Sequence, residues 1–178
     1  MKWVDDLNLK FLSNWLNKRG PEQKIRNIRL DRKNASIELI KYGEDMANAK
    51  RYDEALSLFE KATQVDPLND MAWGDKALML DKLGKTDEAL ISFSKALSID
   101  ANNEITWHNK GLTLIRAKKL RESIDCFDMA IKLRENYAKA WYNKGRAYVM
   151  LGEGIKAKPC LDRAKKLDPM LYTKLTKV

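Results

Sequence analysis

Large and small apolar residues recur along most of this chain at intervals of 34 residues. Trp73, Trp107 and Trp141 stand one interval apart, and Leu39 stands one interval before them. A small residue follows each of these positions by four residues: Gly43, Ala77, Gly111 and Gly145. Because residues four apart lie on the same face of an α-helix, each unit is predicted to begin with a helix that presents bulky and small side chains together.

A second set of recurring positions predicts another helix in each unit. The bulkiest column holds Phe59, Phe93, Phe127 and Leu161, with a column of mostly alanine on either side. The pattern predicts four helix pairs: 36–49 with 53–65, 70–83 with 87–99, 104–117 with 121–133, and 138–151 with 155–167. A fixed period of this length is typical of a solenoid, in which one unit cannot bury its apolar face alone. We therefore expect Phe93 to be buried between its own unit and the next.

Two segments carry a family resemblance. AWYNKGRAY at 140–148 and DEALISFSKALSID at 87–100 closely resemble the first and second helices of the tetratricopeptide repeat. Four consecutive units match this repeat: 36–69, 70–103, 104–137 and 138–171. The resemblance implies an all-α fold, a right-handed superhelical solenoid of antiparallel helix pairs.

The fourth unit departs from the repeat at two positions. Leu161 replaces the phenylalanine, and Pro159 stands inside the second helix. Proline costs about 3 kcal/mol in a helix interior, so this helix is expected to start late or to bend. Beyond the repeats, residues 172–178 form a short tail or the start of a closing helix.

The N-terminal segment, residues 1–35, does not fit the repeat. An amphipathic helix is predicted over about 3–18, followed by a basic connector in which Pro21 is placed to begin the next helix. The apolar face of the first helix holds Trp3, Val4, Leu7, Phe11 and Trp15. We expect this helix to cap the solenoid. Docking in the solenoid's own groove and contact with a second copy are the alternatives.

Charge is distributed unevenly along the chain, whose net charge is +9. Residues 1–35 carry a net charge of +5, residues 36–103 one of −5 and residues 104–178 one of +9. Two interpretations fit this distribution: solvated helix faces, or an anionic partner that contacts the C-terminal half. The apolar share of 44% with 33% charged residues is that of a soluble folded protein.

Residues that carry catalysis or bind metals are scarce. His108 is the only histidine, so neither a catalytic triad nor a site with several histidines can form. Cys126 and Cys160 lack the spacing of metal ligands and are expected to be reduced, in or near the core. The sequence holds neither a glycine-rich phosphate loop nor an apolar run of the ~20 residues that span a membrane. We therefore expect no enzyme activity, no cofactor, no metal and no membrane partner, and a cytoplasmic location.

The resemblance also implies where a partner binds. In the tetratricopeptide repeat, the first helix of each unit lines the concave face, the groove, through positions two before and one, two and five after the Trp column. The expected peptide-binding residues are Met71, Leu78, Ile105, His108, Asn109, Leu112, Arg116, Lys139, Tyr142, Asn143 and Arg146. The same positions hold Ile37, Ile40, Lys41 and Glu44 in unit one and also Gly74 and Asp75 in unit two. The groove is thus expected to be apolar in its first three units and basic and polar in its last. Packing against neighbouring helices is the alternative role of its apolar residues.

Some members of this family grip the terminal carboxylate of a peptide with a clamp of Lys, Asn and Arg residues. Asn109 and Lys139 match that clamp. Gly74, Leu78 and Asn143 stand where its remaining Lys, Asn and Arg would be. Three departures argue against this particular activity.

The function expected from these observations is a non-enzymatic scaffold that binds a peptide segment of another protein in the groove. The partner is expected to present apolar side chains and an acidic group. An RNA-associated module that uses the basic C-terminal half is the alternative, and it would lose affinity steeply with salt. Self-association into a homo-oligomer is a third alternative.

Overall fold

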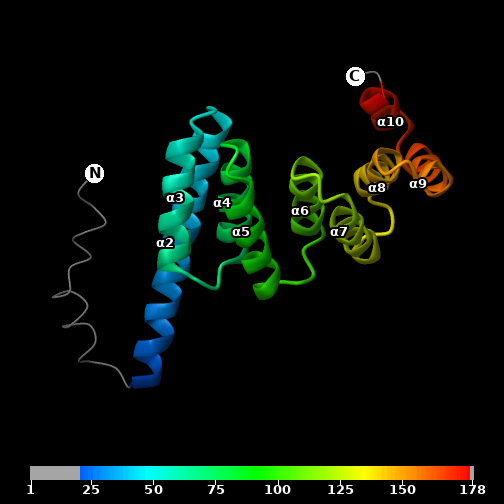
Figure 1. Cartoon of the computed structure of the whole chain (residues 1–178). Coiled ribbons are helices and arrows are strands. Elements are labelled where there is room, and N and C mark those ends of the chain that lie inside the picture. The colour runs from blue at the N-terminus through cyan, green and yellow to red at the C-terminus, as the bar shows by residue number, and fades with distance from the viewer. Residues whose placement is uncertain (1–20, 177–178) are drawn as a thin grey trace.

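The structure, a computed structural model, describes residues 21–176, and within this part of the chain the regular secondary structure is all α-helix (Figure 1). The helices are α2 (Pro21–Asn48), α3 (Tyr52–Val65), α4 (Asp70–Lys82), α5 (Thr86–Ile99), α6 (Glu104–Arg116), α7 (Leu120–Leu133), α8 (Ala138–Met150), α9 (Gly154–Leu167) and α10 (Pro169–Thr176). From α3 to α9, every helix end lies within one residue of its predicted place. The predicted all-α fold of helix pairs is confirmed.

Consecutive helices pack in pairs and the pairs stack in a row, as Figure 1 shows. The most extensive contacts join α2 with α3, α4 with α5, α6 with α7 and α8 with α9. Neighbouring pairs meet through α3 and α4, α5 and α6, and α7 and α8. The first helices also touch one another, α2 with α4, α4 with α6 and α6 with α8. Because contacts between neighbours dominate, stability accumulates along the solenoid by stacking.

The core of each pair joins a small residue of the first helix to a bulky residue of the second. Phe59, Phe93 and Phe127 are only 1%, 1% and 0% exposed, which confirms the predicted burial of Phe93. A Cβ atom on Gly43 or Gly111 would come within 2.6 Å of the ring of Phe59 or Phe127. The recurring small residues therefore allow the two helices to approach closely enough to enclose an aromatic ring.

The recurring tryptophans tie each first helix to the loop before it. The indole Nε1 of each donates a hydrogen bond to a backbone carbonyl six residues earlier in the sequence. The pairs are Trp73 with Pro67 (3.0 Å), Trp107 with Ala101 (2.9 Å) and Trp141 with Glu135 (2.8 Å). A half-buried indole thus fixes the loop between neighbouring units and satisfies its own N–H.

α2 is longer than predicted, and α9 does not show the late start that was one expected effect of its proline. α2 begins at Pro21, the residue expected to start a helix, but residues 21–35 run without a break into the first helix of unit one, which was predicted to begin at 36. Of the two alternatives expected for α9, a late start or a bend, the late start is not found, because the helix begins at Gly154 and holds Pro159 inside it. Proline deprives the Ile155 carbonyl of its usual donor, but Ile155 and Pro159 are both exposed, so water can take that place. The amphipathic helix predicted over 3–18 lies outside the described residues.

The C-terminal end is closed by α10, which packs on α9 and begins with Pro169. Proline suits the first turn of a helix because the backbone N–H that it lacks has no intrahelical acceptor there. The ring of Tyr172 meets that of Tyr142 edge-on, with the two centroids 6.0 Å apart. α10 therefore packs against the first helix of unit four as well as against α9.

Candidate peptide-binding surface

The first helices α2, α4, α6 and α8 form one surface, because each touches the next. We call this surface the groove. Asn69 and Asn103 set where α4 and α6 begin, since their side-chain oxygens accept hydrogen bonds from the backbone N–H groups of Ala72 (3.2 Å) and Thr106 (3.0 Å). Such caps hold the first turn of each helix, and therefore its exposed side chains, at a fixed place.

The first exposed column of the groove is apolar in three units and basic in the fourth. Ile37, Met71 and Ile105 are 49%, 57% and 52% exposed, and Lys139 is exposed at the same repeat position. Large apolar side chains that face solvent in register mark a surface suited to contact with another molecule.

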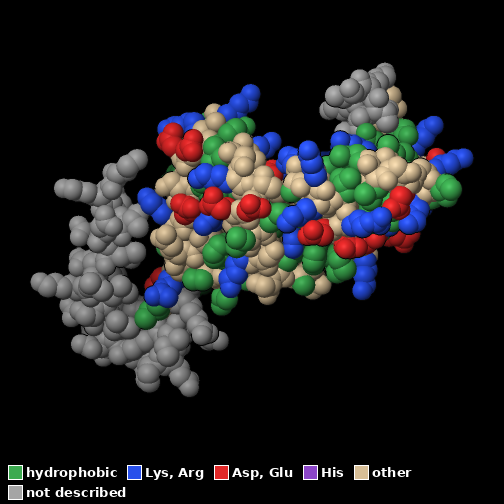
Figure 2. Space-filling view, in the orientation of Figure 1, with side chains coloured by type: hydrophobic (Ala, Val, Ile, Leu, Met, Phe, Trp, Pro, Cys, Tyr) green, Lys and Arg blue, Asp and Glu red, His purple; other side chains and the backbone are tan. Residues whose placement is uncertain are grey.

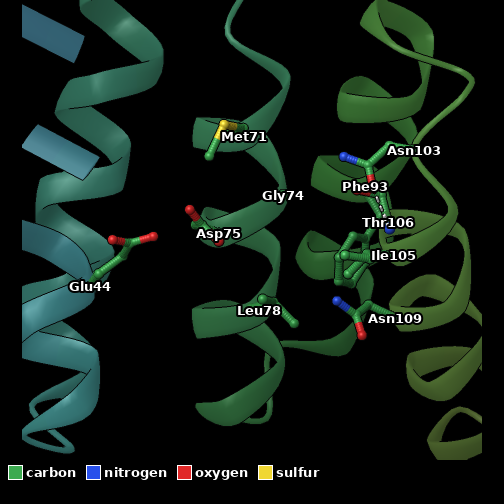
Figure 3. A pocket seen from close by; sticks show the side chains of 10 residues that line it. All are labelled: Glu44, Met71, Gly74, Asp75, Leu78, Phe93, Asn103, Ile105, Thr106 and Asn109. Atoms are coloured by element: carbon green, nitrogen blue, oxygen red, sulfur yellow. Dashed lines mark hydrogen bonds between the residues drawn. The ribbon is translucent and has the colours of Figure 1, made fainter. Parts of the chain in front are cut away.

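A cavity of about 220 Å³ opens over α4, between α2 on one side and α6 on the other (Figure 3). Its lining residues are Glu44, Met71, Gly74, Asp75, Leu78, Phe93, Asn103, Ile105, Thr106 and Asn109. Figure 3 shows the Glu44 side chain extending from α2 toward Asp75 on α4. The two carboxylates thus share the lining with apolar residues and with the uncharged polar residues Asn103, Thr106 and Asn109.

Asp75 titrates far from its ordinary range. Burial, and to a lesser extent repulsion from Glu44 and Asp70, raises the pKa of this carboxyl from 3.8 to about 7. Among the residues that the structure describes, neither Asp75 nor Glu44 has an ion-pair or hydrogen-bond partner. The carboxyl of Asp75 is thus largely but not fully buried, and among the described residues no ion pair or hydrogen bond stabilises its ionised form.

The basic end of the groove lies on α6 and α8. Lys139 and Arg146 are exposed, and the Arg146 guanidinium lies over the Tyr142 ring, 5.9 Å from its centroid. Arg116 is exposed as well but is paired with Asp81, to which its Nε donates at 3.0 Å. Acidic and basic side chains are interspersed on the face seen in Figure 2, with hydrophobic side chains exposed between them. Lys139 and Arg146 are therefore better placed than Arg116 to meet an acidic group.

Three of the expected binding residues are buried: His108 (5% exposed), Tyr142 (7%) and Asn143 (7%). Nε2 of His108 accepts a hydrogen bond from Nδ2 of Asn143 at 3.0 Å, and its Nδ1 lies 3.4 Å from Oδ1 of Asn109. Burial lowers the pKa of His108 to about 4, so the ring is neutral near pH 7. These side chains join α6 to α8 beneath the groove. Leu78, Asn109 and Leu112 are half-buried, whereas Met71 and Ile105 are exposed.

Sequence models of the tetratricopeptide repeat match this chain at residues 45–104, 105–137 and 138–169. These matches cover more than half of the sequence and agree with the helix pairs of the structure. The chain belongs to the tetratricopeptide repeat family. Comparison with curated proteins found no match.

Solved structures resemble this tetratricopeptide repeat protein in fold. A crystal structure of MamA shares 23% sequence identity with a TM-score of 0.68, over 71% of this chain and 74% of that one. A structure from work on Pseudomonas aeruginosa PilF shares 20% identity with a TM-score of 0.72, over 78% and 64%. The first tetratricopeptide domain of Spaghetti (RPAP3), bound to the HSP90 peptide SRMEEVD, shares 19% identity with a TM-score of 0.65, over 67% and 94%. At these identities the likeness concerns the fold.

The remaining chemistry of this tetratricopeptide repeat protein is sparse in the described part of the chain. Residues 21–176 contain no group of three or more His, Cys, Asp or Glu side chains arranged to hold a metal ion. Cys126 and Cys160 are free and buried, and burial raises the pKa of both thiols, that of Cys126 to about 11. No helix among the described residues is long and apolar enough to cross a membrane. The family is in general a non-catalytic protein-interaction module.

The sequence placed Glu44 and Asp75 in the groove but did not reveal that they share a cavity. They occupy different repeat positions, so no single column pairs them. Asn103, Thr106 and Phe93 also line this cavity although none belongs to the expected groove positions. The stacking of first helices is the signal that could have predicted these lining residues, since a residue near the end of one first helix faces a residue near the start of the next.

Proposed function

We propose that this protein is a non-enzymatic scaffold that holds a peptide segment of a partner protein in the groove. The observation that supports it is the exposed apolar column of Ile37, Met71 and Ile105, carried by first helices that touch one another in succession. The peptide-bound Spaghetti domain supports the idea that this fold can hold a peptide.

The partner would present apolar side chains to Met71 and Ile105 and an acidic group to Lys139 and Arg146. Leu78 and Leu112, which are half-buried, would extend the apolar contact. The buried His108, Tyr142 and Asn143 would act from below, by holding α6 and α8 in place. Arg116 would contribute only if the partner displaced Asp81.

Binding of short peptides tests this proposal. The probes are labelled peptides of about 12 residues, which reach roughly 40 Å when extended and vary in apolar and acidic content. Ile105→Glu and Arg146→Ala should each weaken the best peptide by about tenfold or more, because apolar and Arg anchors dominate such interfaces. Lys132→Ala, an exposed change on α7 outside the groove, is the matched control and should change affinity little. Wild-type affinity in both groove variants would refute groove binding.

Salt dependence separates this function from RNA binding through the basic C-terminal half. Affinity for a peptide with one acidic contact should fall only a few-fold between about 50 and 200 mM salt, whereas a ligand that makes several phosphate contacts loses orders of magnitude. A single-stranded RNA that binds more tightly than every peptide, with such a steep salt dependence, would favour the alternative.

We also propose that the protein is located in a reducing compartment, the cytoplasm. Two free, buried cysteines support this location, because oxidising compartments favour disulfides. Fractionation of the native cell is the test, and recovery of the protein in an oxidising compartment would contradict it.

A further inference from the structure

The cavity between α2, α4 and α6 has a polarity opposite to that of the basic end of the groove. Its two carboxylates, Glu44 and Asp75, face an opening bordered by the exposed side chains of Met71 and Ile105. On α6 the lining side chains are uncharged. Acidic groups beside the apolar Met71, Leu78 and Ile105 complement a side chain that is apolar along its stem and positive at its tip.

Asp75 is the more confined of the two carboxylates. Its pKa of about 7 reflects burial first and then repulsion from Glu44 on α2 and Asp70 on its own helix. Asp70 lies at the edge of the same region, where its Oδ2 is 3.5 Å from Nδ2 of Asn103. Every charged group named here is acidic, so a cation in the cavity would relieve repulsion as well as gain attraction.

Gly74 keeps the cavity open. It lies within α4, where glycine destabilises the helix relative to alanine. A Cβ atom at this position would meet only Oγ1 of Thr106, at 3.8 Å, which is an ordinary contact. Close packing therefore does not require glycine here, unlike at Gly43 and Gly111, where the Phe rings approach to 2.6 Å. The absence of a side chain at Gly74 leaves room for a side chain of a bound ligand.

We propose that this cavity binds a Lys or Arg side chain of the partner peptide, with the alkyl stem along Met71, Leu78 and Ile105 and the cationic head between Glu44 and Asp75. The inference rests on the proposed function, because it names a second anchor in the same groove. Lys and Arg side chains commonly lie along apolar surface while their charge meets a polar group. A cavity of about 220 Å³ can hold such a side chain.

The test is a set of peptides that differ at one position. In an apolar frame of about 12 residues, which reaches roughly 40 Å, that position holds Lys, Arg, norleucine or Glu. Norleucine keeps the stem of Lys and removes the charge. The Lys and Arg peptides should bind about tenfold more tightly than the norleucine peptide, since a hydrogen bond to a charged group contributes about 1.5 kcal/mol or more. Equal affinity for Lys and norleucine would overturn the cavity proposal while leaving groove binding intact.

Variants of the protein localise the effect. Glu44→Gln with Asp75→Asn should abolish the preference for Lys over norleucine and leave the affinity for norleucine within about two-fold, because only the charge of the cavity changes. Asp45→Asn is the matched control: it is exposed, adjacent to Glu44 on α2 and absent from the lining. A Lys preference that survives in the double variant, or is lost in the control, would assign the cation to another site.

Filling the cavity gives an independent readout. Gly74→Leu should remove the Lys preference by occupying the space. Thermal unfolding of each variant shows that it remains folded. Failure of every peptide class to bind the wild-type protein would refute the groove function itself. Concentration-dependent self-association that the double variant abolishes would instead identify a second copy as the occupant and overturn the peptide assignment.

Discussion

At the residue scale, the turns inside the four units show how one backbone geometry is met by two kinds of residue. The backbone adopts positive φ at equivalent positions of all four units: Lys50 (60°), Gly84 (78°), Lys118 (60°) and Gly152 (77°). The left-handed conformation is free of strain for glycine and costs an L-residue about 1–2 kcal/mol. Units one and three therefore carry strain that units two and four avoid.

Replacing a strained lysine should stabilise the protein. We expect Lys118→Gly to raise the free energy of unfolding by about 1 kcal/mol, because the turn already has the geometry that glycine prefers. Gly84→Ala is the reciprocal change and should lower it by a similar amount, although a Cβ at Gly84 would meet nothing within 4 Å. Urea denaturation measures both. Changes of the same sign would show that backbone strain does not govern this turn.

Asp75 should make the pH dependence of stability measurable through a single substitution. Its folded-state pKa of about 7 exceeds the ordinary value of 3.8, so the folded protein retains a proton that the unfolded chain releases. Wild-type stability should therefore fall relative to Asp75→Asn as pH rises from about 4 to 7. The free energy of unfolding of Asp75→Asn should exceed that of the wild type by about 2–4 kcal/mol at pH 8 and by little at pH 4, since one pKa unit corresponds to about 1.4 kcal/mol.

His108 changes the pH dependence of stability in the opposite direction, but its effect does not disturb that measurement. Its pKa is lowered from 6.5 to about 4, so its contribution to stability is lost as pH falls through this range. Because both proteins contain His108, its effect cancels in the difference between wild type and Asp75→Asn. If the difference in stability between wild type and Asp75→Asn does not change with pH, the pKa of Asp75 is not raised in the folded protein.

At the element scale, the repeat pattern predicted helices well and exposure less well. The ends of α3 to α9 follow from columns of Trp, Gly, Phe and Ala that pack against one another. The fusion of residues 21–35 with the first helix of unit one did not follow, because these residues lack such columns. Likewise, Tyr142 was expected to face the groove, but α10 brings the Tyr172 ring against it. Periodicity reports which face of a helix packs, not what a later element covers.

The stacking of helix pairs makes a local prediction about Phe93. This ring is 1% exposed and lines the cavity beside Thr106 and Asn109 of the next unit. Phe93→Ala should cost about 3–5 kcal/mol by loss of contact and creation of a void. Because coupling in a solenoid is between neighbours, amide hydrogen exchange should accelerate first in α4 to α7. Uniform acceleration along α2 to α9 would contradict modular stability.

At the scale of the whole molecule, the groove changes polarity along its length. Glu44 lies on α2 and Asp75 on α4, exposed apolar side chains lie on α4 and α6, and Lys139 and Arg146 lie on α8. The net charges of −5 for residues 36–103 and +9 for residues 104–178 already indicated this division in the sequence. The sequence could not show that two acids would share one cavity or that Arg116 would pair with Asp81, because both depend on how units stack.

This polarity predicts the spacing of charges in a bound peptide. Adjacent packed helices lie about 8–10 Å apart. Along the row of first helices, α8 is the second after α4, so the cavity at α4 and the basic residues of α8 are separated by roughly 20 Å. An extended peptide covers that distance in about six residues. We therefore expect a peptide with Lys and Glu about six residues apart to bind best, and peptides with the same composition but a spacing of about two residues to bind about tenfold more weakly, since they can satisfy only one end.

Variants distinguish the two ends in that experiment. Arg146→Ala should remove the affinity that the Glu of the peptide contributes and keep the affinity that its Lys contributes. Asp75→Asn with Glu44→Gln should do the reverse. Because the two ends lie well beyond about 10 Å from one another, the two losses should add when the substitutions are combined. Affinities measured by isothermal titration for the spaced peptides decide the matter. If affinity is independent of spacing, the two ends do not hold one extended peptide, and the charges act as separate surfaces.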